Sequence, residues 1–153
     1  MDLIDKKILT ILQKDVTIPL SDISKRVGIS KTPCWNRIKK MEEDKVILNK
    51  IALLDNNKIN LPITVFLLIS VSSHSQDWIK KFSITIDKYD EITEVYRLTG
   101  SSSDYMLRVV AHSIEDYDKF QQKIINEIEF SKMSSNISLK EMKKNHSFPL
   151  DYI

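Results

Sequence analysis

Residues 21–41 read SDISKRVGISKTPCWNRIKKM, and this stretch decides the fold of the N-terminal part of the chain. Ile23 and Val27 lie four residues apart, so they share one face of a short helix. Gly28 follows at once, where a helix commonly ends in the left-handed region. Ser30 is a preferred N-cap residue for a following helix. The pattern therefore predicts two short helices joined at a glycine.

The second of these helices separates an apolar stripe from a polar surface. Pro33 falls in its first turn, where a missing N–H costs little. Cys34, Ile38 and Met41 recur at helical spacing and predict a buried face. We expect the helix to end near Asp44. Its other side chains are of the types that contact phosphates and base edges, which favours a DNA-binding helix-turn-helix. The alternative is an ordinary helical hairpin with a solvated basic face.

The candidate DNA contacts form two chemical groups. Asn36 can read an adenine edge and Thr32 a thymine methyl group. Lysine and arginine side chains more often contact phosphates, which sets affinity without reading the sequence. The residues predicted to contact DNA are Lys25, Arg26, Ser30, Lys31, Thr32, Pro33, Trp35, Asn36, Arg37, Lys39 and Lys40.

Some residues of the second helix also have a structural interpretation. Trp35 borders the apolar stripe, and packing is favoured there over a base contact. Arg37 can instead pair with a carboxylate such as Glu42 or Asp22. Cys34 lies on the packing stripe, which favours a small buried side chain over a redox switch.

Charge is distributed unevenly along the chain. The 153 residues are 42% apolar and 29% charged, a globular composition with a net charge of +2. Residues 1–54 hold 11 Lys/Arg and 7 Asp/Glu, whereas residues 55–153 hold 12 and 14. A basic front half and a slightly acidic back half suit a DNA-binding head on a body with another task.

Residue types argue against several other functions. With a single cysteine the chain forms no internal disulfide. His74, His112 and His146 show no ligand spacing, so we expect no metal and no cofactor. Two glycines make no phosphate-binding loop, and no Ser–His pair has local support, so we expect no catalytic residue and no enzyme. The N-terminus has no signal peptide and residues 63–71 are too short to span a bilayer, which predicts a cytoplasmic protein.

The segments around the helix-turn-helix complete a predicted N-terminal domain over residues 1–54. Asp2 is a plausible N-cap for a first helix over residues 2–13, whose isoleucines recur at helical spacing. Ser21 is expected to cap the second helix. Residues 46–54 are β-prone and predict a strand pair or wing, which would complete a winged helix-turn-helix.

After a turn-like linker over residues 55–61, a second domain is predicted over residues 62–153. Its hydrophobic periodicity predicts the order strand, helix, strand, strand, helix, strand. The expected strands are 63–72, 91–99, 104–111 and 132–142, and the helices carry the stripes Trp78, Phe82, Ile86 and Tyr117, Phe120, Ile124, Ile128. Ser113 is expected to cap the second of those helices. This is the split βαβ order of an α+β ferredoxin-like sandwich. Because the strands are apolar at most positions, the sheet face without helices favours a face-to-face dimer.

A winged helix-turn-helix followed by a ferredoxin-like domain resembles the Lrp/AsnC, or feast/famine, family of transcription regulators. The segments that carry the resemblance are DLIDKKILTILQKD, SDISKRVGISKTPCWNRIKKMEEDKVI, IALLDNNKINLP and TGSSSDYMLRV. The TPCW form, with EVYRLTG and SIEDYDKF, is most similar to a branch whose members often sense cysteine or related sulfur compounds.

The resemblance implies a mechanism. Dimers form through the C-terminal domains and often assemble into octamers, and the paired heads read palindromic or wrapped double-stranded DNA. A small effector, usually an amino acid, binds between dimers near the glycine loop before the third strand and changes assembly or DNA geometry. The residues implied at that site are Gly100, Ser101, Ser102, Ser103, Asp104 and Tyr105.

The implied effector loop departs from the family pattern Gly-Asp-x-Asp-Tyr. Here Gly100–Tyr105 is one residue longer and lacks the first acid. Three serines can still hydrogen-bond an α-amino acid. An architectural DNA-wrapping protein with little effector response is therefore an alternative function, and an amino-acid sensor that acts on a partner protein is a third.

Overall fold

The computed structural model describes residues 1–100 and 102–152, which form two compact units. Unit 1 is Met1–Leu53 with Met142–Ile153, and unit 2 is Leu54–Glu141. The sequence-based division placed the C-terminal tail with the second domain. In the structure the tail groups with unit 1, because the Gln13 side chain donates to the Phe148 carbonyl (3.0 Å) and accepts from the Phe148 N–H (2.9 Å).

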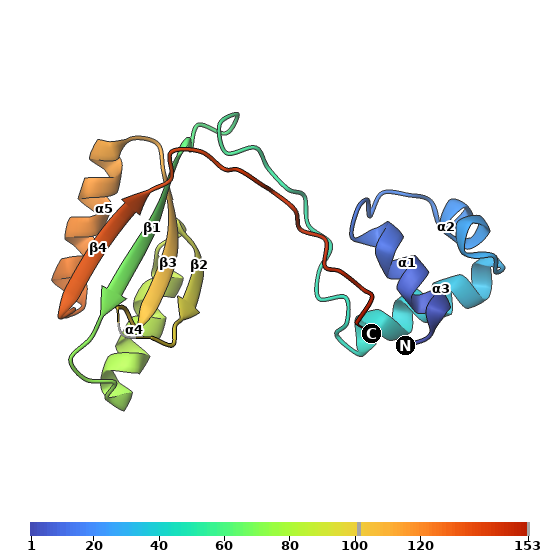
Figure 1. Ribbon diagram of the computed structural model, residues 1–153, viewed down its shortest axis with the longest axis horizontal. Coiled ribbons are helices and arrows are strands. Elements are labelled where there is room, and N and C mark those ends of the chain that lie inside the picture. Colours follow the sequence, from blue (N-terminus) through green and yellow to red (C-terminus); the bar gives the residue numbers. More distant parts are fainter. Residues whose placement is uncertain (101, 153) are drawn as a thin grey trace. The chain divides into compact units, whose positions relative to one another are not determined.

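Unit 1 packs three helices around a small core. They are α1 (Leu3–Leu12), α2 (Leu20–Val27) and α3 (Lys31–Glu43), labelled in Figure 1. The buried apolar residues are Ile8, Leu12, Ile23, Val27, Cys34, Ile38 and Met41. The predicted stripe of α3 is thus confirmed as its core face. Cys34 is fully buried, and this burial raises the pKa of its thiol, as expected for a small core side chain.

The helix starts show which cap predictions hold. Asp2 caps α1 as predicted, since its carboxylate accepts from the N–H groups of Ile4 and Asp5. Ser30 occupies the N-cap of α3, although its hydroxyl makes no capping hydrogen bond to the described residues. The Ser21 cap is wrong. Because the Pro19 carbonyl accepts from the N–H groups of Asp22 and Ile23, α2 starts before Ser21.

The strand pair predicted over residues 46–54 is wrong, because none of these residues, all of them described, lies in a strand. Lys45 leaves α3 in the left-handed region (φ +58°), and the carbonyl of Met41 accepts from the next two N–H groups. The segment beyond exposes Leu48 and Ile51. A β-prone stretch stays unpaired where no neighbouring strand offers a ladder, since β-propensity depends on cross-strand packing.

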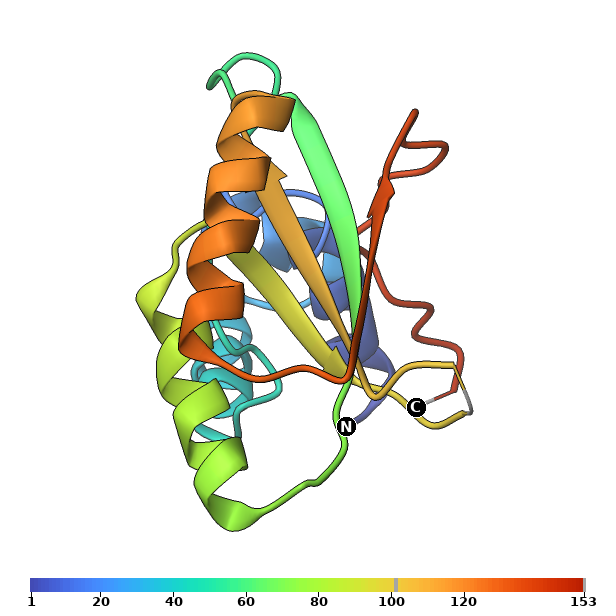
Figure 2. The ribbon, with the colours of Figure 1, turned by 90° about the vertical axis from the view of Figure 1, so that its left-hand side faces the viewer.

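Unit 2 is the expected α+β sandwich. Its elements are β1 (Ile63–Ser70), α4 (Gln76–Lys88), β2 (Ile92–Arg97), β3 (Tyr105–Ala111), α5 (Ile114–Glu127) and β4 (Lys132–Ile137). The strands form one antiparallel sheet in the order β2-β3-β1-β4, and Figure 2 shows α4 and α5 on the same face of it. Among the described residues, no helix has both the length and the apolar character needed to cross a bilayer.

Alternation along the strands builds the core of unit 2. Val65, Leu67, Ile69, Leu107 and Val109 point to the helices and are fully buried. From the helices, the packing partners are Phe82, Tyr117, Phe120 and Ile124, and Ser75 and Ser113 cap α4 and α5. The predicted stripes of both helices are confirmed.

The opposite face of the sheet carries the alternate residues of the same strands, and we call it the helix-free sheet face. Its central members are Phe66, Leu68, Met106, Arg108 and Val110, with Phe66 opposite Arg108 and Leu68 opposite Met106. Arg108 lies 3.5 Å from Glu94 of β2. The face is therefore apolar at its centre and charged toward the β2 edge.

Three strands end earlier than predicted, and β2 stops at Arg97 instead of Thr99. β4 stops at Ile137 instead of Met142, because its partner strand β1 begins at Ile63 and the last backbone bond joins the Ser138 N–H to the Thr64 carbonyl. β1 stops at Ser70 instead of Ser72. The next N–H, that of Val71, donates to the side chain of Asp104 instead of to a neighbouring strand.

Candidate DNA-binding surface and effector loop

The bend between α2 and α3 requires its glycine for backbone geometry. Gly28 has φ +78°, and its N–H bonds to the carbonyls of Ser24 and Lys25. A Cβ at this position would meet nothing within 4 Å, so the left-handed backbone alone makes the position unfavourable for other residues. The short turn lets α3 begin at Lys31, directly after the N-cap Ser30.

Ten of the eleven predicted DNA contacts lie on the surface of unit 1. Lys25 and Arg26 are exposed in the last turn of α2. The exposed residues at the start of α3 and along it are Ser30, Lys31, Thr32, Pro33, Trp35, Asn36, Lys39 and Lys40. The fold thus brings together the basic end of α2 and the polar side of α3, and the core stripe faces away from them.

Trp35 corrects one interpretation from the sequence. Packing was favoured for this side chain, yet the residue is 50% exposed. The Lys39 ammonium lies 5.9 Å from the centroid of its ring. Because its indole is half exposed and lies beneath a cation, Trp35 is a surface residue and does not belong to the core.

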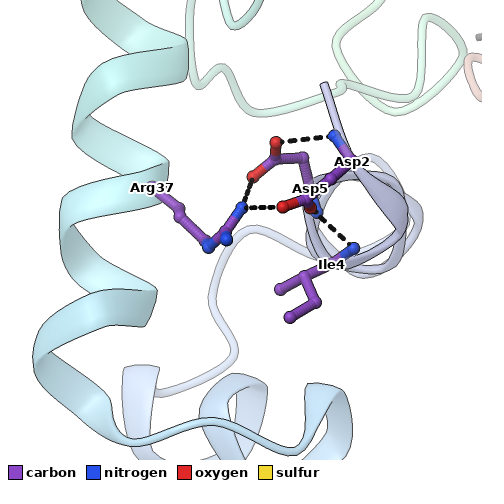
Figure 3. A network of polar contacts seen from close by, with 4 residues as sticks. All are labelled: Asp2, Ile4, Asp5 and Arg37. Atoms are coloured by element: carbon purple, nitrogen blue, oxygen red, sulfur yellow. Dashed lines mark hydrogen bonds and ion pairs between the residues drawn. The ribbon is translucent and has the colours of Figure 1, made fainter.

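Arg37 is the exception among the predicted contacts, because it turns toward α1. One terminal nitrogen donates to Asp2 (2.7 Å) and to Asp5 (2.8 Å), as Figure 3 shows. The N–H of Asp5 and the Arg37 guanidinium hold the pKa of the Asp2 carboxyl below its ordinary value. The sequence suggested Glu42 or Asp22 as the partner, and this was wrong.

Glu42 instead pairs with two lysines. Its carboxylate lies 2.6 Å from the Lys50 ammonium and 3.0 Å from that of Lys39. The hydrogen bond from Lys50, followed by that from Lys39, lowers the pKa of Glu42. Part of the positive charge at the C-terminal end of α3 is therefore compensated. Lys31 in its first turn and Lys40 in its last turn form no ion pair with the described residues.

The second candidate site is the loop that joins β2 to β3. Gly100 enters it with φ +140°, and the Leu98 N–H bonds to the Asp104 carbonyl and closes it. Ser70 donates to the Ser102 carbonyl (3.4 Å), and the Ser103 hydroxyl donates to the same carbonyl (2.6 Å). Ser101, which the family resemblance places at the effector site, lies outside the described residues.

Asp104 fixes this loop to the end of β1. Its carboxylate accepts from the Val71 N–H (2.8 Å), and its own N–H donates to the Ile69 carbonyl. The other carboxylate oxygen lies 3.7 Å from Nε2 of His74. One oxygen of Asp104 therefore serves the fold, and the second faces the loop after β1.

His74 was missed as a neighbour of the effector loop. Its ring lies 5.9 Å from that of Tyr105, centroid to centroid, and 6.5 Å from that of Trp78. A signal for it existed, because in an antiparallel pair the residues after one strand meet those before the other. Tyr105 is only 7% exposed, and its ring packs against Phe82 in the core. Its side chain therefore points away from the β2–β3 loop, and only its backbone borders that loop.

We expect Asp104→Ala to lower the free energy of unfolding by about 1 kcal/mol, because the Val71 N–H loses its acceptor. Asp104→Asn keeps an acceptor oxygen and should cost less. Thermal unfolding of both variants checks this, with Asp118→Ala on the exposed side of α5 as the control. Equal stability of the Ala and Asn variants would contradict a role of this oxygen in holding the loop.

The two units together define a class of protein, a regulator with a DNA-binding head and a ligand-binding body. Residues 1–47 match the winged helix-turn-helix DNA-binding family, and residues 64–148 match the Lrp/AsnC ligand binding domain. The chain belongs to the Lrp/AsnC family of transcription regulators.

Named relatives span nearly the whole chain. The glutamate uptake regulatory protein of Zymomonas mobilis is 39% identical over 150 residues, which cover 98% of this chain and 91% of that protein. The DNA-binding transcriptional activator DecR of Escherichia coli is 34% identical over 152 residues, 99% of each chain. The family likeness thus extends over head and body together.

Solved structures share the fold over its full length. The crystal structure of an AsnC family transcriptional regulator from Agrobacterium tumefaciens has a TM-score of 0.95 at 46% identity, covering 100% of this chain and 99% of that chain. A transcriptional regulator from Neisseria meningitidis, solved as a complex with L-Met, has a TM-score of 0.93 at 27% identity, covering 99% and 98%.

Proposed function

We propose that this transcription regulator reads its DNA site with the exposed side of α3 and changes its assembly or DNA affinity when an amino-acid effector binds near the β2–β3 loop. The observation that carries the first part is the arrangement of α3. Its apolar stripe is buried, while Lys31, Thr32, Asn36 and Lys40 remain exposed on the same helix. A helix of this kind fits the major groove of a duplex. As a regulator of transcription, it would act in the cytoplasm.

Binding to DNA at two salt concentrations tests the first part. A sequence-specific regulator should prefer its own promoter over random DNA by at least ~10³. Phosphate contacts by Lys25, Arg26, Lys31 and Lys40 should make both affinities fall as salt rises. A ratio that stays near one would favour the alternative, an architectural protein that wraps DNA. No binding at low ionic strength would leave the head as a protein-contact surface.

Asn36→Ala should cost roughly 1–3 kcal/mol on the best DNA site and relax the base preference at one position, because a carboxamide can form two hydrogen bonds with N6 and N7 on the major-groove edge of an adenine. Competition binding against sites changed one base pair at a time measures this. Asn126→Ala, an exposed asparagine on α5 of unit 2, is the matched control. An equal loss on all sequences would make Asn36 a backbone contact.

The effector part of the proposal is supported by the chemistry of the β2–β3 loop. Ser102, Ser103 and the Asp104 oxygen that faces His74 offer hydroxyl groups and a carboxylate, the groups that an α-amino acid requires. Unlike the family loop, this one lacks the first acid, so we expect a preference that differs from other members. The solved relative from N. meningitidis carries L-Met.

A thermal-shift screen of the full-length protein against the twenty amino acids tests the effector part, since a ligand that prefers the folded state raises the melting temperature. Cysteine and methionine are the first candidates, given the resemblance to the sulfur-sensing branch. A hit should also change DNA affinity or particle mass. A screen without any shift would favour the DNA-wrapping alternative.

For assembly, we propose a homodimer closed over the helix-free sheet face, with dimers joining into octamers. Phe66, Leu68 and Met106 give this face an apolar centre, which a second copy of the chain would cover. A two-fold axis also suits a palindromic operator, because it places two heads on one duplex.

A further inference from the structure

Arg37 occupies an unusual place for a basic residue of a DNA-binding helix. It lies in the middle of α3, between Asn36 and the core residue Ile38, and its side chain is 34% exposed. The guanidinium lies between two carboxylates of α1. Its Nη1 donates to both of them, so the positive charge that a DNA phosphate would meet here is already compensated.

The two carboxylates are themselves fixed by the start of α1. One oxygen of Asp2 accepts from the N–H groups of Ile4 (2.9 Å) and Asp5 (3.0 Å), and one oxygen of Asp5 accepts from the Asp2 N–H (3.0 Å). The remaining oxygen of each accepts from Arg37. Figure 3 shows this division of the four oxygens. The cap that begins α1 and the contact that holds α3 therefore use the same two residues.

This network supplies a directional contact that the core lacks. Beside this network, α3 packs on α1 and α2 through apolar side chains such as Cys34, Ile38 and Met41. Apolar burial is not directional and tolerates small rotations of a helix. Hydrogen bonds from one guanidinium to two held carboxylates have a narrow geometry, and charge makes them stronger than neutral ones.

We propose that Arg37 is a positioning residue, which sets the rotation of α3 against α1 so that the exposed side chains meet the base edges, and that it makes no phosphate contact. The inference rests on the proposed role of α3 in DNA reading. Base contacts need an orientation accurate to a fraction of an ångström, whereas phosphate contacts tolerate movement. Loss of the network should therefore weaken specific binding more than non-specific binding.

The test measures affinity for the best site and for random DNA over a range of salt, with Arg37→Ala and Asp5→Ala. Both variants should lower the preference for the best site by roughly 10-fold, within the range for contacts in one ion-pair network. The slope of affinity against salt should stay unchanged for Arg37→Ala. The double variant should be no worse than Arg37→Ala, because that variant has already lost the contact to Asp5.

Two controls separate positioning from charge. Lys40→Ala should reduce the salt slope by about 0.9, as a lost phosphate contact does. Glu43→Ala removes an exposed negative charge from the end of α3 and should leave the preference unchanged. Thermal unfolding of each variant verifies that the head is folded, and Asp5→Ala tests the proposal with Arg37 still in place.

A fall of the salt slope by about 0.9 in Arg37→Ala, together with tighter DNA binding by Asp5→Ala, would overturn the proposal and make Arg37 a phosphate contact. An unchanged site preference in both variants would overturn it as well. Wild-type protein that binds no DNA would contradict the proposed function of α3, and this inference would end with it. Binding by the wild type with unaltered preference in the variants would contradict only the role of Arg37.

Discussion

Leu107→Ala should lower the free energy of unfolding of unit 2 by about 2–5 kcal/mol, the range for a fully buried leucine. Leu107 lies at the centre of β3, is 0% exposed, and belongs to the cluster that joins the sheet to α4 and α5. The loss combines the missing transfer energy of the side chain with the cavity left between sheet and helices. Unit 1 has a core of its own and should keep its stability.

The two tryptophans allow each unit to be followed separately. Trp35 belongs to unit 1, and Trp78, which stacks on Phe82 at 4.8 Å, belongs to unit 2. In a Trp35→Phe background, denaturant unfolding followed by fluorescence reports unit 2 alone. Leu139→Ala is the matched control, since that leucine is 98% exposed. Equal stability of the two variants would contradict the inward direction of Leu107.

Leu68→Glu should weaken dimerisation at least ~100-fold, because an unpaired carboxylate in a closed interface costs about 3 kcal/mol or more. Leu68 lies in the central strand β1, on the helix-free sheet face, opposite Met106 of β3 and Ser134 of β4. A two-fold interface contains the substitution twice and brings the two charges close together. The helix-packed core is not touched, so each protomer should stay folded.

Light scattering over a range of protein concentrations measures this effect, and DNA binding of the variant reports whether two heads are needed. Ile84→Glu is the control, because Ile84 is 70% exposed on α4, away from the helix-free sheet face. If Leu68→Glu kept the wild-type mass at low concentration, the dimer interface would lie elsewhere. A change in mass from Ile84→Glu alone would point to the helix side.

Much of the fold was predictable because the deciding signals are local. The spacing of Cys34, Ile38 and Met41 identified the core face of α3, and Gly28 identified the bend. The strand and helix order of unit 2 followed from its hydrophobic periodicity, and all the expected elements of that unit are present. Periodicity reports which side of an element is buried, and this does not depend on distant residues.

The predictions that were wrong concern residues whose structure depends on a distant or a competing partner. Ser21 is a good capping residue, but α2 begins before it, because the Pro19 carbonyl already accepts from the N–H groups of Asp22 and Ile23. Residues 46–54 have the composition of a strand and lack a strand beside them. Arg37 pairs with Asp2 and Asp5, more than thirty residues away, and local spacing pointed only to carboxylates nearby.

The candidate sites were predicted in part for the same reason. The exposed side of α3 could be predicted from the spacing within that one helix. Of the eleven DNA contacts predicted on α2 and α3 together, ten are on the surface. The surroundings of the β2–β3 loop depend on strand register, so His74 and the Val71 N–H went unrecognised. Whether these residues bind DNA or an effector stays a prediction until the variants are measured.

The pairing of Gln13 with Phe148 has a consequence for the order of synthesis. The head combines Met1–Leu53 with the tail Met142–Ile153, so its two pieces leave the ribosome with the whole of unit 2 between them. Domains fold as they emerge, N-terminal first. The three helices can form early. Gln13 at the end of α1 can contact Phe148 only after the effector-binding body has been translated. During synthesis the head is therefore incomplete until translation has passed the body.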